Sequence, residues 1–202
     1  MSHTEMLLAN GEHYERRFRG PATGRPALGV AIVACMDARI DVYSILGLHP
    51  GEAHVVRNAG GVVTDDVIRS LTISQHELGT TEIILIHHTK CGMLTFTDKE
   101  FKTKIAAETG RKPPWPSMAF ADVDEDVRAS IAQLKAAPFL NRTREVRGFV
   151  FDVDTGALRE VRGAEMSPAA LPFAELPQLQ ENAQPTDELP LVARPRALRR
   201  QG

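Results

Sequence analysis

The sequence predicts an α/β protein with a central, mostly parallel β-sheet flanked by helices, followed by an irregular C-terminal tail. Three short apolar runs within residues 28–88 alternate with stretches of helical character, an order typical of parallel strands joined by right-handed crossovers. The 202 residues are enough for one domain with a core of its own. We expect this domain over residues 1–166 and the tail over residues 167–202.

The composition excludes several classes of protein. With 24 basic and 26 acidic residues the formal net charge is −2, whereas a dedicated nucleic-acid binder would show a basic field. Two cysteines cannot form a disulfide framework. No apolar stretch approaches the roughly 20 residues of a membrane span, and the polar N-terminus lacks an export signal. We therefore expect a cytoplasmic protein with no nucleic-acid or membrane partner, whose reduced cysteines bind metal or act in catalysis.

Three strands are predicted from short apolar runs. Residues 28–35 (LGVAIVAC) form a continuous β-branched run, which indicates a strand that is buried on both faces. Residues 53–58 (AHVVRN) form the second strand, and residues 81–88 (TEIILIHH) give the strongest of the three signals.

Helices are predicted before and between these strands. A loose apolar stripe over residues 4–18 indicates a helix that is broken near Gly11. A short helix over residues 42–46 and a longer one over residues 65–78 join the strands. The longer helix begins after Thr64, which can cap it, and Gly79 is a natural stop.

The remaining elements complete the domain. Two helices are predicted over residues 98–108 and 123–136, and a hairpin is predicted from residues 148–153, a turn, and residues 157–161. Residues 167–202 hold six of the 13 prolines and show no sustained period, which predicts a mobile tail.

Metal-binding residues stand at the carboxyl ends of two predicted strands, where open α/β sheets bind their ligands. The first strand ends at Cys35 and is followed by Asp37 and Arg39, and the third ends at His88 with Cys91 three residues later. If these strands are neighbours, both cysteines and the histidine converge. Two thiolates and an imidazole suit tetrahedral zinc, and catalytic zinc sites keep one position open.

The competing interpretation is structural, since a lone cysteine at a strand end is usually a small buried hydrophobe. The conjunction of both cysteines with HxxC spacing favours metal binding. Gly92 is expected to let the backbone approach its neighbours closely. Because side chains alternate along a strand, His87 faces away from His88 and is expected to be packed or hydrogen-bonded.

Asp37 and Arg39 share a face with Cys35 if the extended backbone persists. The arginine can then hold the carboxylate through a fork of two hydrogen bonds. So held, Asp37 accepts a hydrogen bond from a zinc-bound water, or it replaces that water as fourth ligand. The alternative is an ion pair on the surface without a role at the metal.

Three motifs together resemble the β-class carbonic anhydrases: CxDxR at residues 35–39, RNAGG at residues 57–61 and HxxCG at residues 88–92. The likeness runs from about residue 31 to residue 161 and is greatest to the short mycobacterial and actinobacterial members.

The resemblance implies one zinc per chain, held by Cys35, His88 and Cys91, with Asp37 and Arg39 as the catalytic dyad. Asp37 would be a ligand only in a closed state. The cleft would be lined by Asn58, Ala59, Gly60, Gly61 and Gly92. The resemblance also implies two-fold dimers, sometimes tetramers, in which the N-terminal helix lies across the partner.

The implied function is the reversible hydration of carbon dioxide to bicarbonate and a proton, by attack of zinc-bound hydroxide oriented by the Asp/Arg dyad. One alternative is hydrolysis of carbonyl sulfide or carbon disulfide on the same fold. Another is a non-catalytic zinc-binding protein in which Asp37 closes the metal site. The proton shuttle stays open among His49, His54, His76 and His87.

Overall fold

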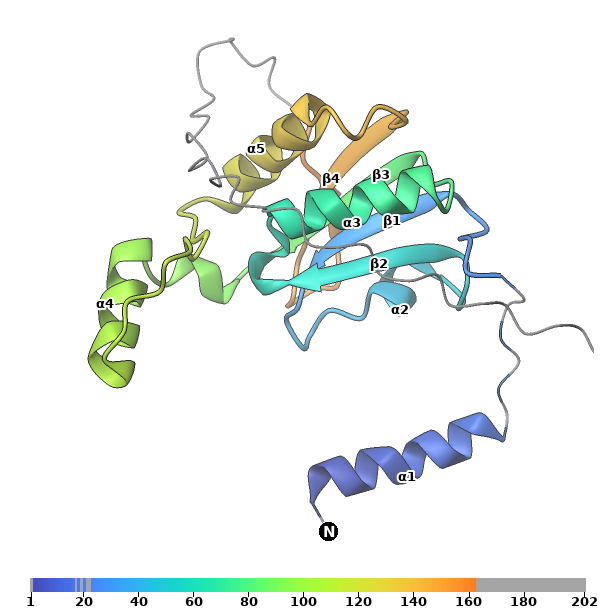
Figure 1. The fold of residues 1–202 in the computed structure, drawn as a ribbon, viewed down its shortest axis with the longest axis horizontal. Coiled ribbons are helices and arrows are strands. Elements are labelled where there is room, and N and C mark those ends of the chain that lie inside the picture. Colours follow the sequence, from blue (N-terminus) through green and yellow to red (C-terminus); the bar gives the residue numbers. More distant parts are fainter. Residues whose placement is uncertain (1, 17, 19, 21–22, 163–202) are drawn as a thin grey trace, which may run out of the picture. The chain divides into compact units, whose positions relative to one another are not determined.

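The computed structural model describes residues 2–16, 18, 20 and 23–162, which belong to one structural unit. The centre of this unit is a five-stranded sheet of order β2-β1-β3-β4-β5 (Figure 1). The strands are β1 (Val30–Cys35), β2 (Ala53–Asn58), β3 (Glu82–His88), β4 (Glu145–Phe151) and β5 (Leu158–Glu160). The first four run parallel, and only β5 is antiparallel to its neighbour β4. The predicted fold class is therefore confirmed, and the predicted tail lies outside the described residues.

Strand β1 lies inside the sheet, between β2 and β3, and is buried on both faces from Ala31 to Cys35. Its β-branched run predicted this, because both faces of such a strand are covered by other elements. The strand begins at Val30 rather than at the predicted residue 28. Gly29 has a φ of +66°, outside the extended region, and Leu28 is 56% exposed.

Helices cover both faces of the sheet. On one face, α3 (Asp65–His76) and α5 (Val123–Ala136) contribute to a core that contains Leu71 and Leu134. On the other face, α2 (Val42–Leu46) contributes Val42 to a second core (Figure 1).

Local signals explain where α3 begins and ends. The Thr64 side chain accepts a hydrogen bond from the backbone N–H of Val67 and caps the first turn. The helix ends at His76, two residues earlier than predicted. Gly79 follows with a φ of +79°, and its N–H donates to the carbonyl of Gln75.

The close packing of α5 on β4 depends on a glycine. A Cβ on Gly148 would lie 2.3 Å from Cγ1 of Val127 and 2.9 Å from Cδ1 of Ile131. The absence of a side chain in the strand therefore lets the helix approach the sheet.

Helix α1 (His3–Glu15) begins with a capping box between Ser2 and Glu5. The predicted break near Gly11 is wrong, because the helix continues through this residue and ends at Glu15. A single glycine lowers helix stability without interrupting the hydrogen bonds. No residue of α1 is buried.

The segment after β3 contains a 3₁₀ turn (Gly92–Leu94) and α4 (Asp98–Thr109), which starts at a capping box of Thr97 and Glu100. The predicted hairpin is present, but its first strand, β4, begins at Glu145 and ends at Phe151. The earlier start follows from pairing with β3, whose Glu82 lies opposite Glu145.

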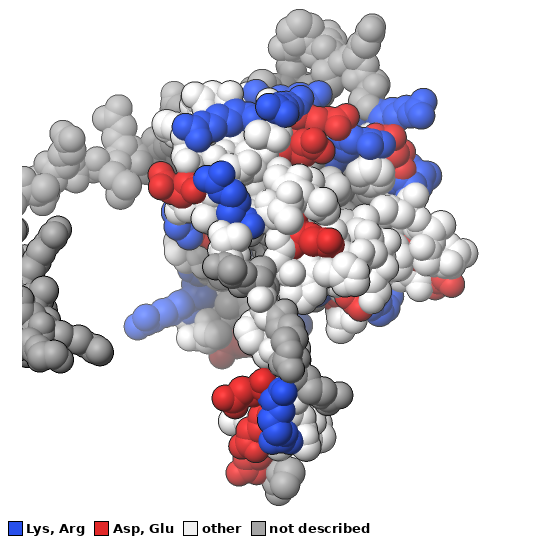
Figure 2. Space-filling model, turned by 90° about the vertical axis from the view of Figure 1, so that its right-hand side faces the viewer, with Lys and Arg blue, Asp and Glu red and all other residues white. Residues whose placement is uncertain are grey.

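Charged side chains of both signs are interspersed on the face of the molecule shown in Figure 2. Among the described helices, none has the length and apolar character that crossing a bilayer requires.

Candidate metal centre

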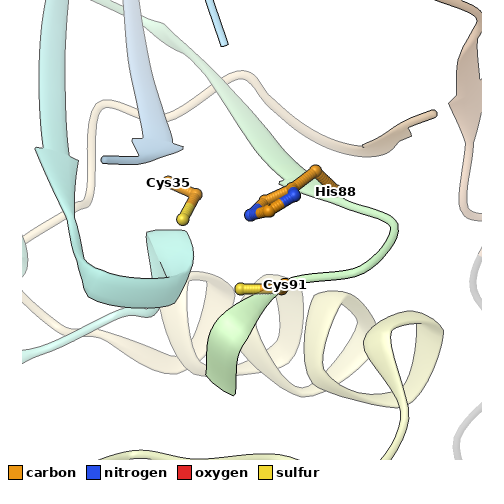
Figure 3. A group of neighbouring side chains, drawn as sticks. All are labelled: Cys35, His88 and Cys91. Atoms are coloured by element: carbon orange, nitrogen blue, oxygen red, sulfur yellow. The ribbon is translucent and has the colours of Figure 1, made fainter. Parts of the chain in front are cut away.

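Cys35, His88 and Cys91 converge at the carboxyl edge of the sheet. Cys35 and His88 are the last residues of β1 and β3, which are adjacent parallel strands, and Cys91 follows in the loop after β3. One donor atom of each residue lies within 4.8 Å of the other two, and all three residues are buried. Their side chains point toward a common centre (Figure 3). The predicted convergence therefore holds in space.

The donor set fits a zinc ion. The Nδ1 atom of His88 lies 2.9 Å from the backbone carbonyl of Thr89, so this nitrogen carries the proton and donates it there. The other ring nitrogen, Nε2, is buried and has no hydrogen-bond partner among the described residues. A buried lone pair facing two sulfur atoms is what a tetrahedral nitrogen and sulfur ligand set requires, and a backbone acceptor on the far nitrogen is its usual support.

The two thiols differ in their affinity for a proton. The Cys91 side chain, then His88 and the backbone N–H groups of Asp37 and Gly60 lower the pKa of Cys35, although burial opposes this. The Cys35 side chain and burial raise the pKa of Cys91. A divalent cation between the sulfurs would stabilise both as thiolates.

Asp37 and Arg39 lie beside this centre. The arginine donates from Nε to Oδ1 at 2.8 Å and from Nη2 to Oδ2 at 2.7 Å, and its backbone N–H donates to Oδ1 at 2.9 Å. These bonds, above all those from the guanidinium, hold the pKa of Asp37 well below its usual range. With its pKa lowered in this way, the carboxylate is ionised. Its Oδ2 lies 3.7 Å from Nε2 of His88, next to the donor cluster.

Residues 58–61 lie against the end of β1 rather than forming a separate surface. The Asn58 carbonyl accepts from the N–H of Met36. Gly60 has a φ of +88°, and its backbone N–H is one of the groups that lower the pKa of the Cys35 thiol. A Cβ on Gly61 would lie 2.8 Å from the Cys35 nitrogen, so only glycine allows this approach. Ala59 is exposed at the tip of the turn.

Comparison with known proteins identifies the family. Residues 30–112 match the family model for carbonic anhydrase. Beta-carbonic anhydrase 1 of Mycobacterium tuberculosis is 57% identical over 161 residues, which are 80% of this chain and 99% of that protein. The chain belongs to the β-carbonic anhydrase family. The resemblance of its motifs is thereby confirmed, and members of this family are zinc enzymes.

Two further proteins are similar to this chain. A crystal structure of carbonic anhydrase from Streptococcus mutans is 43% identical, with a TM-score of 0.75, and the alignment covers 80% of this chain and 99% of that one. A carbon disulfide hydrolase of Acidithiobacillus thiooxidans is 34% identical over 177 residues, covering 75% of this chain and 81% of that protein.

Gly92 of this β-carbonic anhydrase does not have the packing role that the sequence suggested. A Cβ at this position would meet no heavy atom within 4 Å, and the residue is exposed. The close approaches are made at Gly61 and at Gly60, where a Cβ would lie 3.1 Å from Met93 and 3.3 Å from Phe120. Phe120 comes from the loop before α5, and no sequence pattern marks it as a neighbour of the site.

The four candidate histidines have separate surroundings. His87 is fully buried, and its Nε2 lies 2.7 Å from Oδ2 of Asp126, as expected of a packed, hydrogen-bonded residue. His54, near the amino end of β2, bonds to Ser74, and His76 bonds to the carbonyl of Phe139. His49 is exposed.

Proposed function

We propose that the protein catalyses the zinc-dependent, reversible hydration of carbon dioxide to bicarbonate and a proton. One zinc per chain would be held by Cys35, His88 and Cys91. The observation that supports this most strongly is the convergence of two buried sulfurs on Nε2 of His88, which has no hydrogen-bond partner among the described residues. The 57% identity to a β-carbonic anhydrase supports the choice of reaction.

A bound zinc ion supplies a Lewis acid that makes water nucleophilic near neutral pH. The residues of the chain then position the reactants. Asp37 is ionised and can only accept a hydrogen bond, so it fixes the proton of the attacking oxygen and leaves a lone pair for the substrate. Arg39 holds the carboxylate by two hydrogen bonds. The proposed catalytic dyad is therefore one preorganised unit.

Apolar groups surround the ligand cluster. Cys35 and Cys91 belong to a buried apolar cluster with Met93, and Phe120 packs against it. Such surroundings favour a small, uncharged, linear molecule over water. The substrate cleft that we propose is lined by Asn58, Ala59, Gly60, Gly61 and Gly92.

Asp37 as a fourth ligand is the alternative for a closed state. Its two side-chain bonds to Arg39 support the open arrangement, because the carboxylate would have to give them up to reach a metal.

Carbon disulfide is the second candidate substrate. A relative that is 34% identical is a carbon disulfide hydrolase, and this substrate is also small, linear and apolar. The ligand motif does not distinguish the two reactions.

We also propose that the protein is a cytoplasmic homodimer or tetramer whose residues 1–166 suffice for activity. Leu7, Leu8 and Tyr14 of α1 are each more than half exposed, at 63%, 67% and 59%, which suits a helix that packs on a second copy.

The test is to measure zinc content and the rate of carbon dioxide hydration on the same sample, with a parallel assay of carbon disulfide hydrolysis. We expect about one zinc per chain and hydration that is lost with a chelator and restored by zinc. Full zinc occupancy with carbon disulfide hydrolysis and no hydration would favour the second candidate. A protein without zinc would refute both.

A further inference from the structure

Arg57, near the end of β2, is hydrogen-bonded to the backbone of the proposed ligand Cys35 and of Asp37. Its Nε donates to the carbonyl of Cys35 at 3.0 Å, and its Nη2 donates to the carbonyl of Asp37 at 2.8 Å. Both acceptors lie where regular pairing stops, since Cys35 is the last residue of β1 and Asp37 lies beyond it.

The guanidinium suits this task because its N–H groups are fixed in one plane. Two of them reach carbonyls that are two residues apart and so set the path of the chain between them. The Asp37 carbonyl also accepts from the N–H of Ile40 at 3.0 Å. The turn after β1 is thus fixed both from within and from the neighbouring strand.

Two groups of the site depend on this turn. The Cys35 sulfur belongs to the buried donor cluster, and the Asp37 carboxylate stands 3.7 Å from Nε2 of His88. Arg57 bonds to neither the sulfur nor the carboxylate in the described contacts, whereas Arg39 bonds to the carboxylate directly.

We propose that Arg57 is a positioning residue. It holds the backbone of Cys35 and Asp37 so that the Cys35 sulfur and the Asp37 carboxylate both face the metal ion. This proposal rests on the proposed zinc site. Supporting groups behind metal ligands commonly change affinity by roughly 10–100-fold when they are removed.

The experiment compares Arg57→Met, which keeps the aliphatic bulk, with Arg57→Lys and with the control Arg69→Met. Arg69 is an exposed arginine on α3 whose side chain bonds to Asp66, away from the metal centre. For each protein we would measure zinc affinity by chelator competition, the visible spectrum of the Co²⁺-substituted form, thermal unfolding, and kcat and KM for hydration.

For Arg57→Met we expect zinc affinity to fall by roughly 10–100-fold and the Co²⁺ spectrum to change. We expect kcat to fall by up to about 100-fold with KM little changed, because the Asp37 carboxylate is displaced rather than the substrate. Arg57→Lys should be intermediate, since a single ammonium cannot span both carbonyls with a planar fork. Arg69→Met should match the wild type in all four measurements.

Wild-type zinc affinity and an unchanged Co²⁺ spectrum in Arg57→Met would overturn the proposal. If Arg57→Met does not fold, an Arg57→Lys protein identical to the wild type in affinity and kcat would overturn it equally. A wild-type protein that binds no zinc would instead refute the proposed function, and this inference with it.

Discussion

The carboxylate of Asp37 accepts two hydrogen bonds from the Arg39 guanidinium, from Nε at 2.8 Å and from Nη2 at 2.7 Å. The arginine side chain is nevertheless 48% exposed. An exposed ion pair of this kind adds little stability. Here the same arginine also donates from Nη2 to the carbonyl of Lys90 at 3.2 Å, in the loop between His88 and Cys91. The pair thus connects the turn after β1 with the loop after β3.

Replacing Asp37 by asparagine tests the proposed role of its carboxylate. An amide can donate as well as accept, so it no longer fixes the proton of the attacking oxygen. We expect Asp37→Asn to keep about one zinc per chain while kcat falls by roughly 10–1,000-fold. Stopped-flow hydration and zinc analysis of the same sample provide the measurement.

The matched control is Asp66→Asn, which disrupts an exposed aspartate–arginine pair on α3. This variant should hydrate carbon dioxide at the wild-type rate. Equal rates in Asp37→Asn and the wild type would show that Asp37 and Arg39 form an ordinary surface pair.

Replacing either cysteine by serine tests the proposed ligands. A hydroxyl is a much poorer ligand for zinc than a thiolate, so Cys35→Ser and Cys91→Ser should each purify with far less than one zinc per chain. Zinc analysis together with circular dichroism would show whether the fold survives the loss. Full occupancy in either well-folded variant would remove that cysteine from the ligand set.

The convergence of the site was predictable because it depends on topology. Parallel strands end at one edge of a sheet, so residues at the ends of β1 and β3 meet once these strands are neighbours. Cys35 and His88 therefore come together although 53 positions separate them in the sequence.

Contacts made by long side chains were not predictable in this way. Arg57 reaches from β2 to two carbonyls at and just beyond the end of β1, and Phe120 reaches Gly60 from a distant loop, yet neither contact follows from strand order. The role assigned to Gly92 was wrong for a related reason, since a glycine does not reveal whether its backbone is crowded. Helix α1 likewise continues through Gly11, so a single glycine in the sequence did not reveal where the helix ends.

Two glycines of the proposed cleft provide a contrast in packing. Gly61 has a φ of +73°, and a Cβ there would lie 2.8 Å from the Cys35 nitrogen, whereas a Cβ on Gly92 would meet nothing within 4 Å. We expect Gly61→Ala to lower the free energy of unfolding by about 1–3 kcal/mol and to reduce zinc affinity. Gly92→Ala should change the unfolding free energy by less than about 0.5 kcal/mol. Denaturant titration of both variants provides the test, and equal stabilities would contradict the crowding at Gly61.

The last prediction concerns acid stability, away from the metal centre. Arg159 donates to the Asp124 carboxylate from Nη1 at 3.0 Å and from Nη2 at 2.7 Å, joining β5 to α5. These bonds are the main reason that the pKa of Asp124 lies below its usual range. A carboxyl whose pKa is lower in the folded state stabilises the protein above the unfolded pKa, which is about 3.9, and this contribution is lost as the pH falls through the folded pKa.

We expect Asp124→Asn to lower the free energy of unfolding at pH 7 by about 0.2–1 kcal/mol, since Arg159 is largely exposed. The difference from the wild type should shrink as the pH falls below about 4. A double-mutant cycle with Arg159→Met isolates the pair from the separate effect of a charge in the first turn of α5. The coupling energy should be favourable at pH 7 and approach zero in acid, where the carboxylate is protonated. A coupling energy that is the same at both pH values would show that the pair does not contribute through its charge.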